Sequence, residues 1–139
     1  MDLRQLTPDI SVSPQILPQD VAALADAGFR VLINNRPDEE AEPGQDSETI
    51  ARLAREAGLE YHYIPFHPGQ ITPDMVTAFG AAMDSAGPKM AYCRSGNRST
   101  VLWALSQAGR IPEAELVEIA TRAGYDLTPV RGLIRSLGS

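Results

Sequence analysis

The chain has 139 residues, 43% of them hydrophobic and 22% charged, which suits a single globular domain over residues 1–139. Its net charge of −6 argues against nucleic-acid binding, which needs basic surface to neutralise phosphates. We expect no membrane segment and no signal peptide, because no apolar run is long enough and the basic and apolar start is missing. One cysteine excludes an internal disulfide and suits a reducing compartment, so we expect a cytoplasmic protein.

Strands and helices are expected to alternate along the chain, because short branched runs alternate with segments of helical periodicity. In chain order the patterns predict a strand at 10–13, a helix at 18–28, a strand at 29–35, a polar loop at 36–45, a helix at 46–58, a strand at 59–65, a loop at 66–71, a helix at 72–87, a strand at 89–93 and helices at 97–108, 111–124 and 128–137. This order predicts an α/β fold with a mostly parallel central sheet flanked by helices.

The most informative segment is AYCRSGNRS, residues 91–99, between the last predicted strand and an apolar helix. It places Cys93, the only cysteine, at the carboxyl end of a strand, where ligands gather in open α/β sheets. The first amides of the following helix lack internal partners and favour an anion. Together with Arg94 and Arg98 they favour the thiolate, which is a strong nucleophile.

The other loop residues have expected roles around this thiol. Gly96 can take the positive φ that lets the loop curl, and Arg98 can hold two oxygens of an oxyanion. The hydroxyl of Ser99 is expected to donate to the thiolate or to cap the helix. The alternative is a buried structural thiol followed by helix-capping residues, namely Ser95, Asn97 and Ser99.

Two further residues are candidates for the same edge of the sheet. Arg36 follows the strand at 29–35, so it either lines the site or supports a loop through a salt bridge. His67 follows an Ile-Pro pair in YIPFHPGQ and is a candidate acid, or simply a solvated side chain. No metal site and no cofactor are expected, because HExxH, CxxC and the Gly-Lys-Ser/Thr ending of a phosphate-binding P-loop are all missing.

The loop resembles the active-site loop of rhodaneses, which has the form Cys-x4-Arg. Three longer blocks, ISVSPQILPQDVAALADAGFRVLINNRPDEE, GLEYHYIPF and AYCRSGNRSTVLWALSQAGR, resemble the beta-lactamase hydrolase-like family over about residues 3–126. The resemblance implies the fold of the dual-specificity phosphatases. It also implies a role in sulfide detoxification as a sulfurtransferase, with a persulfide dioxygenase as a partner or fused domain, although many members were first labelled phosphatases.

Two features favour a sulfurtransferase over a phosphatase at this stage. Four residues separate Cys93 from Arg98, whereas cysteine phosphatases have five, and the tighter cup is expected to suit a persulfide sulfur. Dual-specificity phosphatases carry an aspartate shortly after an Ile-Pro pair, and His67 stands there instead. We therefore expect a Cys93 persulfide, a donor such as thiosulfate or glutathione persulfide, and a thiol or cyanide acceptor.

Two alternatives stay open. One is a phosphatase of the dual-specificity type that acts through a phosphocysteine, which the fold resemblance and the oxyanion-binding loop both favour. The other is a non-catalytic sensor that binds an anion or a persulfide and docks a partner. A bound anion without turnover of either kind of substrate would indicate the sensor.

Overall fold

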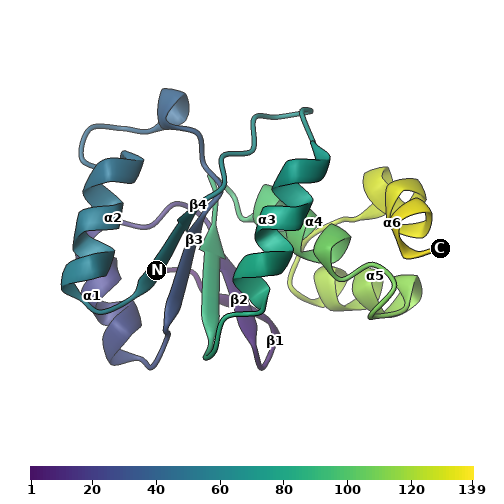
Figure 1. Cartoon of the computed structure of the whole chain (residues 1–139), viewed down its shortest axis with the longest axis horizontal. Coiled ribbons are helices and arrows are strands. Elements are labelled where there is room, and N and C mark those ends of the chain that lie inside the picture. Colours follow the sequence, from purple (N-terminus) through teal and green to yellow (C-terminus); the bar gives the residue numbers. More distant parts are fainter.

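A five-stranded sheet with helices on both faces forms the protein, as the computed structural model of residues 1–139 shows (Figure 1). The order of the strands is β1-β2-β5-β3-β4. Neighbours are parallel except at one edge, where β1 pairs with β2 in the antiparallel direction. The strands are β1 Arg4–Thr7, β2 Ile10–Ser13, β3 Val31–Asn34, β4 Glu60–Tyr63 and β5 Lys89–Tyr92. The predicted α/β class with a mostly parallel sheet is confirmed.

All six predicted helices are present. Five are shorter than predicted, and the sixth begins three residues later and ends one residue later than predicted. In one example the Asp46 side chain accepts the Thr49 N–H at 3.2 Å, so Asp46 caps the next helix and stands outside it. The α-helices are α1 Pro18–Asp26, α2 Ser47–Glu56, α3 Pro73–Met83, α4 Asn97–Ser106, α5 Glu113–Arg122 and α6 Arg131–Gly138. Two 3-10 turns add η1 Asp38–Glu40, inside the predicted polar loop, and η2 Thr128–Val130, just before α6. None of the helices combines the length and the apolar character that crossing a membrane requires.

Strand β1 is the element that the sequence pattern did not indicate. Its sequence, Arg-Gln-Leu-Thr, is mostly polar, and only Leu6 is buried. This strand shows no alternation of apolar and polar residues. It lies at an edge of the sheet, and its conformation depends on pairing with β2, which its own sequence does not reveal. Strand β5, whose carboxyl end leads into the candidate site, lies in the middle of the sheet.

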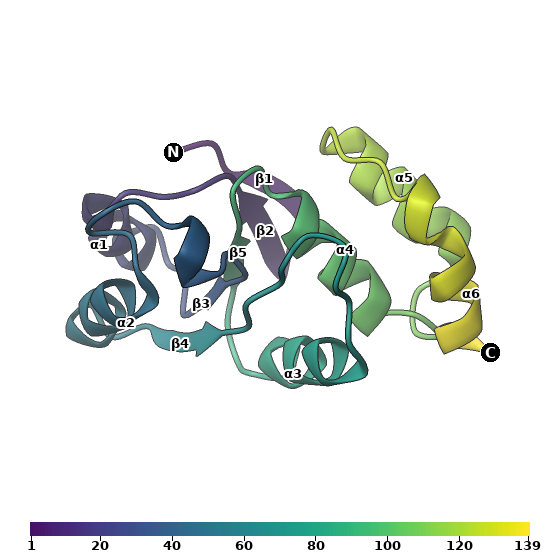
Figure 2. The same cartoon turned by 90° about the horizontal axis from the view of Figure 1, so that it is seen from above.

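The two faces of the sheet are covered by different helices. Helices α1 and α2 cover one face, and α3 and α4 cover the other, with α5 and α6 beyond α4 (Figures 1 and 2). Neighbouring strand residues divide between the two cores: Leu32 packs on the α1–α2 side, whereas Ile33 packs with Phe79 and Leu102 on the other. Because α4 is enclosed by the sheet and by other helices, its middle residues are all buried, which explains why its sequence is apolar nearly all round.

Candidate active site

Cys93 lies directly after β5, in the centre of the sheet, and is fully buried. Its backbone N–H donates to the Ser13 carbonyl on the neighbouring strand at 3.4 Å. The Gly96 N–H donates to the Cys93 Sγ at 3.1 Å, so the loop folds back over the sulfur. This amide stands at the start of α4, where the helix dipole favours negative charge. The structure therefore places the Cys93 sulfur against a backbone N–H donor at the start of α4.

Gly96 has the conformation that the loop requires, with φ of +92°, immediately before α4. A Cβ atom at this position would lie 2.1 Å from the hydroxyl oxygen of Tyr125. That hydroxyl donates to the Ser95 carbonyl at 3.0 Å, and the Arg4 guanidinium lies over the Tyr125 ring, 5.2 Å from its centre. Tyr125 thus holds the loop from outside, a role that sequence reasoning missed because this tyrosine lies in the turn after α5.

Arg98, in the first turn of α4, is held by two groups from distant parts of the chain. Its Nη1 and Nη2 donate to the two carboxylate oxygens of Glu40, at 2.9 and 2.7 Å. Nη1 also donates to the Phe66 carbonyl at 2.6 Å. The bonded carboxylate raises the pKa of Arg98, and charge on the nearby Cys93 sulfur adds to this effect. In return, hydrogen bonding to Arg98 lowers the pKa of Glu40.

The arrangement of these bonds leaves one edge of the guanidinium of Arg98 available. A guanidinium has five N–H donors in a rigid fork, and here three of them are used by Glu40 and Phe66. The Nε hydrogen and the second Nη2 hydrogen point along the same remaining edge. An edge of this kind can hold two oxygens of an oxyanion at once. Glu40 therefore orients Arg98 without occupying the face that an anion needs.

Arg36 supports the loop that carries Glu40. Its Nη2 donates to the Glu40 carbonyl at 2.6 Å, and its Nη1 donates to Gln15 Oε1 at 2.9 Å. Only 11% of its side chain is exposed. Of the two roles predicted from the sequence, the structure therefore gives Arg36 the supporting one, holding η1 against the loop after β2.

Ser99 differs from its expected role. Its side chain is fully buried and donates to Asn35 Oδ1 at 2.8 Å, and the Asn35 amide in turn donates to the Ile64 carbonyl at 2.9 Å. The hydroxyl therefore joins α4 to the ends of β3 and β4 instead of donating to the thiolate or capping the helix. Its place within the helix explains the difference, since α4 begins at Asn97 and the hydroxyl points back toward the sheet.

The remaining predicted residues lie on the surface around the loop. Arg94 is exposed, and its positive charge helps to lower the pKa of Glu40. Ser95 Oγ accepts the Asn97 N–H at 3.3 Å at the beginning of α4. His67 pairs through Nε2 with Glu39 at 2.5 Å, and 46% of its side chain is exposed. His67 thus sits on the rim, tied to the 3-10 turn η1.

A groove with a volume of about 360 Å³ opens beside the loop. Three segments form it: the loop between β4 and α3, the start of α4 and the residues that lead from α5 into η2. Only two charged residues line it, Arg98 and Asp126, and Asp126 had no motif by which the sequence could reveal it. The rest of the wall is largely apolar, with Phe66, Ile71, Val101 and Val130 among its residues.

The fold and the site define a class of protein. A thiol at the junction of the central strand and an enclosed helix, covered by a loop amide and flanked by an oriented arginine, is the arrangement of a cysteine-based enzyme on a phosphatase-like fold. One solved structure of this fold, P. aeruginosa TpbA in complex with phosphotyrosine, has a TM-score of 0.67 and 17% identity, and covers 99% of this chain and 88% of that one.

The family follows from the sequence comparison. The family described as beta-lactamase hydrolase-like protein, phosphatase-like domain, matches residues 2–110, and the chain belongs to this family. A beta-lactamase hydrolase-like protein of Agrobacterium fabrum is 35% identical over 122 residues, which cover 85% of this chain and 28% of that protein. The chain therefore spans less than a third of the length of the curated relatives it matches. A candidate phosphatase from Neisseria meningitidis Z2491 has 29% identity, a TM-score of 0.81 and 99% coverage of both chains.

These findings correct the main functional prediction. The sequence favoured a sulfurtransferase, whereas the matching domain is phosphatase-like and solved structures at 27–29% identity are named as phosphatases. The number of residues between Cys93 and Arg98 was a poor guide to the reaction. Glu40 and the Phe66 carbonyl position Arg98, so the length of the loop does not set its place alone. The persulfide and the role in sulfide detoxification are withdrawn with that prediction. The sulfur donors and thiol acceptor belonged to the same reaction, and no comparison tests them.

Proposed function

We propose that the chain is a cysteine-dependent phosphatase that cleaves phosphate monoesters through a phosphocysteine intermediate. The observation that carries this proposal is the geometry around Cys93, with the Gly96 amide 3.1 Å from Sγ and Arg98 held with one edge of its guanidinium open. The phosphatase-like family and the names of the structural neighbours support the same chemistry. The oxyanion that the open edge of Arg98 binds is then the phosphoryl group of the substrate, and the loop and Arg98 stabilise its charge.

The reaction runs in two steps. The Cys93 thiolate attacks phosphorus, an S–P bond forms, and the ester P–O bond breaks with its electron pair leaving on the oxygen. The open edge of Arg98 holds two non-bridging oxygens of the phosphoryl group while charge builds on them. Water then attacks the phosphocysteine, the S–P bond breaks, and inorganic phosphate and the thiolate are released.

The lack of a positioned acid in the groove favours aryl esters as substrates. No carboxylic acid is poised in the groove, since Glu40 is bound to Arg98 and hydrogen bonds from Thr128 lower the pKa of Asp126. His67, on the rim, remains the candidate proton donor. A phenol leaves with a pKa of about 10, so it needs less help from an acid than an alcohol does. The apolar walls of the groove also suit an aromatic ring.

The test compares aryl and alkyl phosphates on the purified chain. We expect turnover of para-nitrophenyl phosphate and phosphotyrosine, and little turnover of phosphoserine. Cys93→Ser should lower kcat by about 10⁴-fold or more, as expected for loss of a nucleophile. Rapid quenching should trap a phosphate adduct on Cys93, seen by intact mass. Turnover that survives Cys93→Ser, or a sulfur adduct from thiosulfate in place of the phosphate adduct, would contradict the proposal.

A further inference from the structure

The two charged residues that line the groove differ in how their charge is compensated. Arg98 makes a double hydrogen bond to Glu40 and lies close to the Cys93 sulfur, so its positive charge is already matched. Asp126, on the segment between α5 and η2, forms no ion pair with any lysine, arginine or histidine. Its negative charge is therefore the one uncompensated charge on the wall.

Asp126 is held in place by the backbone. Its Oδ1 accepts the Thr128 N–H at 2.9 Å, at the beginning of η2. Hydrogen bonds from Thr128 lower the pKa of Asp126, so the carboxylate is ionised at neutral pH. The neighbouring residues Pro129 and Val130 continue the wall and bring no opposite charge. A fixed carboxylate thus faces the same groove as the anion-binding loop.

Arg98 and Asp126 are expected to contact different parts of a bound substrate. The phosphoryl group belongs at Arg98, whose open edge binds two oxygens, and the rest of the substrate extends along the apolar wall. Asp126 lies on the segment between α5 and η2, so a leaving group that extends along the wall to this segment meets its carboxylate. Asp126 is exposed, so water screens its charge, and the carboxylate acts mainly on a leaving group whose charge comes close to it.

We infer that Asp126 is a specificity-determining residue, which makes the site favour aryl phosphates with a positively charged leaving group and disfavour those with a negative one. This inference rests on the proposed phosphatase function and names the substrate class. The net charge of −6 acts in the same direction at long range, although salt screens that part most strongly. The class includes phenyl phosphates with an ammonium substituent and phosphotyrosine beside lysine or arginine.

The test uses three phenyl phosphates that differ only in charge. They carry a para aminomethyl group, a para hydroxymethyl group or a para carboxymethyl group, so that the leaving phenols have similar acidity. We expect kcat/KM to fall from the cationic to the neutral to the anionic ester. One unit charge beside an exposed carboxylate gives a step of about two- to fivefold, and high salt should shrink it.

Two variants separate the charge from the fold. Asp126→Asn keeps an oxygen that can accept the Thr128 N–H, and it should bring the three kcat/KM values to within about twofold of one another. Asp84→Asn makes the same change in net charge at the far end of α3, away from the groove, and should leave the discrimination as it is.

The outcomes keep this inference apart from the proposed function. Turnover of the neutral ester with equal values for all three substrates, or discrimination that survives Asp126→Asn, overturns the role of Asp126 alone. If no ester is turned over, the proposed function fails. In that case calorimetric binding of the three esters to the Cys93→Ser variant decides: the order cationic, neutral, anionic supports Asp126, and equal affinity overturns it.

Discussion

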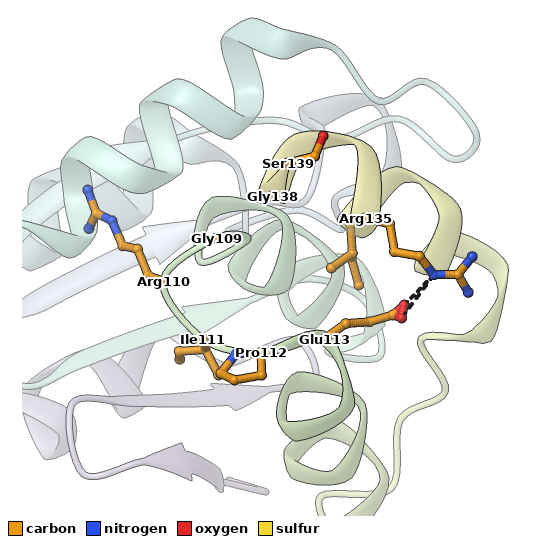
Figure 3. Close-up of a pocket in the computed structure, with 9 residues that line it drawn as sticks. Gly109, Arg110, Ile111, Pro112, Glu113, Arg135, Gly138 and Ser139 are labelled. Carbon is orange, nitrogen blue, oxygen red and sulfur yellow. Dashed lines mark hydrogen bonds and ion pairs between the residues drawn. The ribbon is translucent and has the colours of Figure 1, made fainter.

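Helix α4 has a hollow at each end, and the two hollows are almost equal in volume, about 360 Å³ beside Arg98 and about 340 Å³ at the opposite end. The second one is lined by residues 109–113 and by Ile134, Arg135, Gly138 and Ser139 near the end of the chain (Figure 3). Each contains an arginine bonded to a glutamate. In the second hollow, Arg135 Nε donates to both carboxylate oxygens of Glu113, at 2.6 and 3.0 Å.

The direction of the helix separates the two hollows. The N-terminal end presents backbone N–H groups without partners inside the helix and a buried thiol, and the arginine there is only 14% exposed. The C-terminal end presents carbonyl groups, no nucleophile and an arginine that is 65% exposed. We therefore expect an oxyanion to be stabilised at the first end and not at the second. Size and an Arg–Glu pair therefore do not define a catalytic site, whereas the helix start and the nucleophile do.

Between the two hollows, the largest difference is expected when the arginine of each is replaced. Arg98→Lys keeps the charge but removes the fork that holds two oxygens, so kcat/KM for an aryl phosphate should fall about 10²–10³-fold. The matched change Arg135→Lys at the other end of α4 should leave kcat/KM within about twofold, because that pair is exposed. Steady-state kinetics on both variants check this. Equal effects of the two substitutions would remove the distinction between the hollows.

Two glycines give the next largest effect. Gly96→Ala places a Cβ against Tyr125 at a positive φ, which should destabilise the fold by about 1–3 kcal/mol and lower kcat about tenfold or more. Gly109 also has a positive φ, +85°, but a Cβ at this position would lie 3.4 Å from its nearest neighbour, the Gly138 Cα. Gly109→Ala should therefore destabilise the protein less and leave kcat unchanged. Denaturant unfolding and kinetics measure both, and a larger effect at Gly109 would contradict this account.

Replacing the glutamate of each Arg–Glu pair tests what the pair contributes. Glu40→Gln is expected to lower kcat/KM about tenfold, because Arg98 loses its orientation. Glu113→Gln should leave kcat/KM unchanged. Hydrogen bonding to Arg98 holds the pKa of Glu40 below its ordinary value of 4.5. A lowered pKa in the folded state means that the charged pair stabilises the fold above pH 4.5 and that this contribution is lost as pH falls through the folded pKa.

The pH dependence gives a second measurement for the same variant. The free energy of unfolding of the unmodified protein should exceed that of Glu40→Gln by about 1 kcal/mol at neutral pH, the difference between a charged and a neutral hydrogen bond. The gap should close in acid. A gap that is constant with pH, or a Glu40→Gln variant with full activity, would show that Arg98 is oriented by the Phe66 carbonyl alone.

Local patterns predicted the fold and the centre of the site, because the residues concerned are neighbours in sequence. The alternation of strands and helices, the place of Cys93 and the positive φ of Gly96 all depend on segments of a few residues. Arg98 was found by its spacing from Cys93, but its partner Glu40 lies 58 residues away, and Tyr125 bonds to a carbonyl 30 residues away. Contacts of that separation leave no periodic or spacing signal in a single sequence.

The same limit explains the error over chemistry. Counting the residues between Cys93 and Arg98 treats the loop as if its length alone set the width of the anion cup. In the structure Glu40 and the Phe66 carbonyl place the guanidinium, and neither belongs to the loop. Asp126 was missed for a related reason, since a lone aspartate after a helix is ordinary in sequence and gains meaning only from the groove it lines.

The smallest effect is expected at Tyr125. Tyr125→Phe removes the donor to the Ser95 carbonyl and should cost about 0.5–1.5 kcal/mol of stability, with a modest loss of kcat. The same hydroxyl oxygen is the atom that a Cβ at Gly96 would meet first. In the Gly96→Ala background, Tyr125→Phe should therefore cost nothing or restore part of the lost stability, because it removes the overlap. Additive losses in the double variant would mean that backbone strain at Gly96, and not contact with Tyr125, accounts for the glycine.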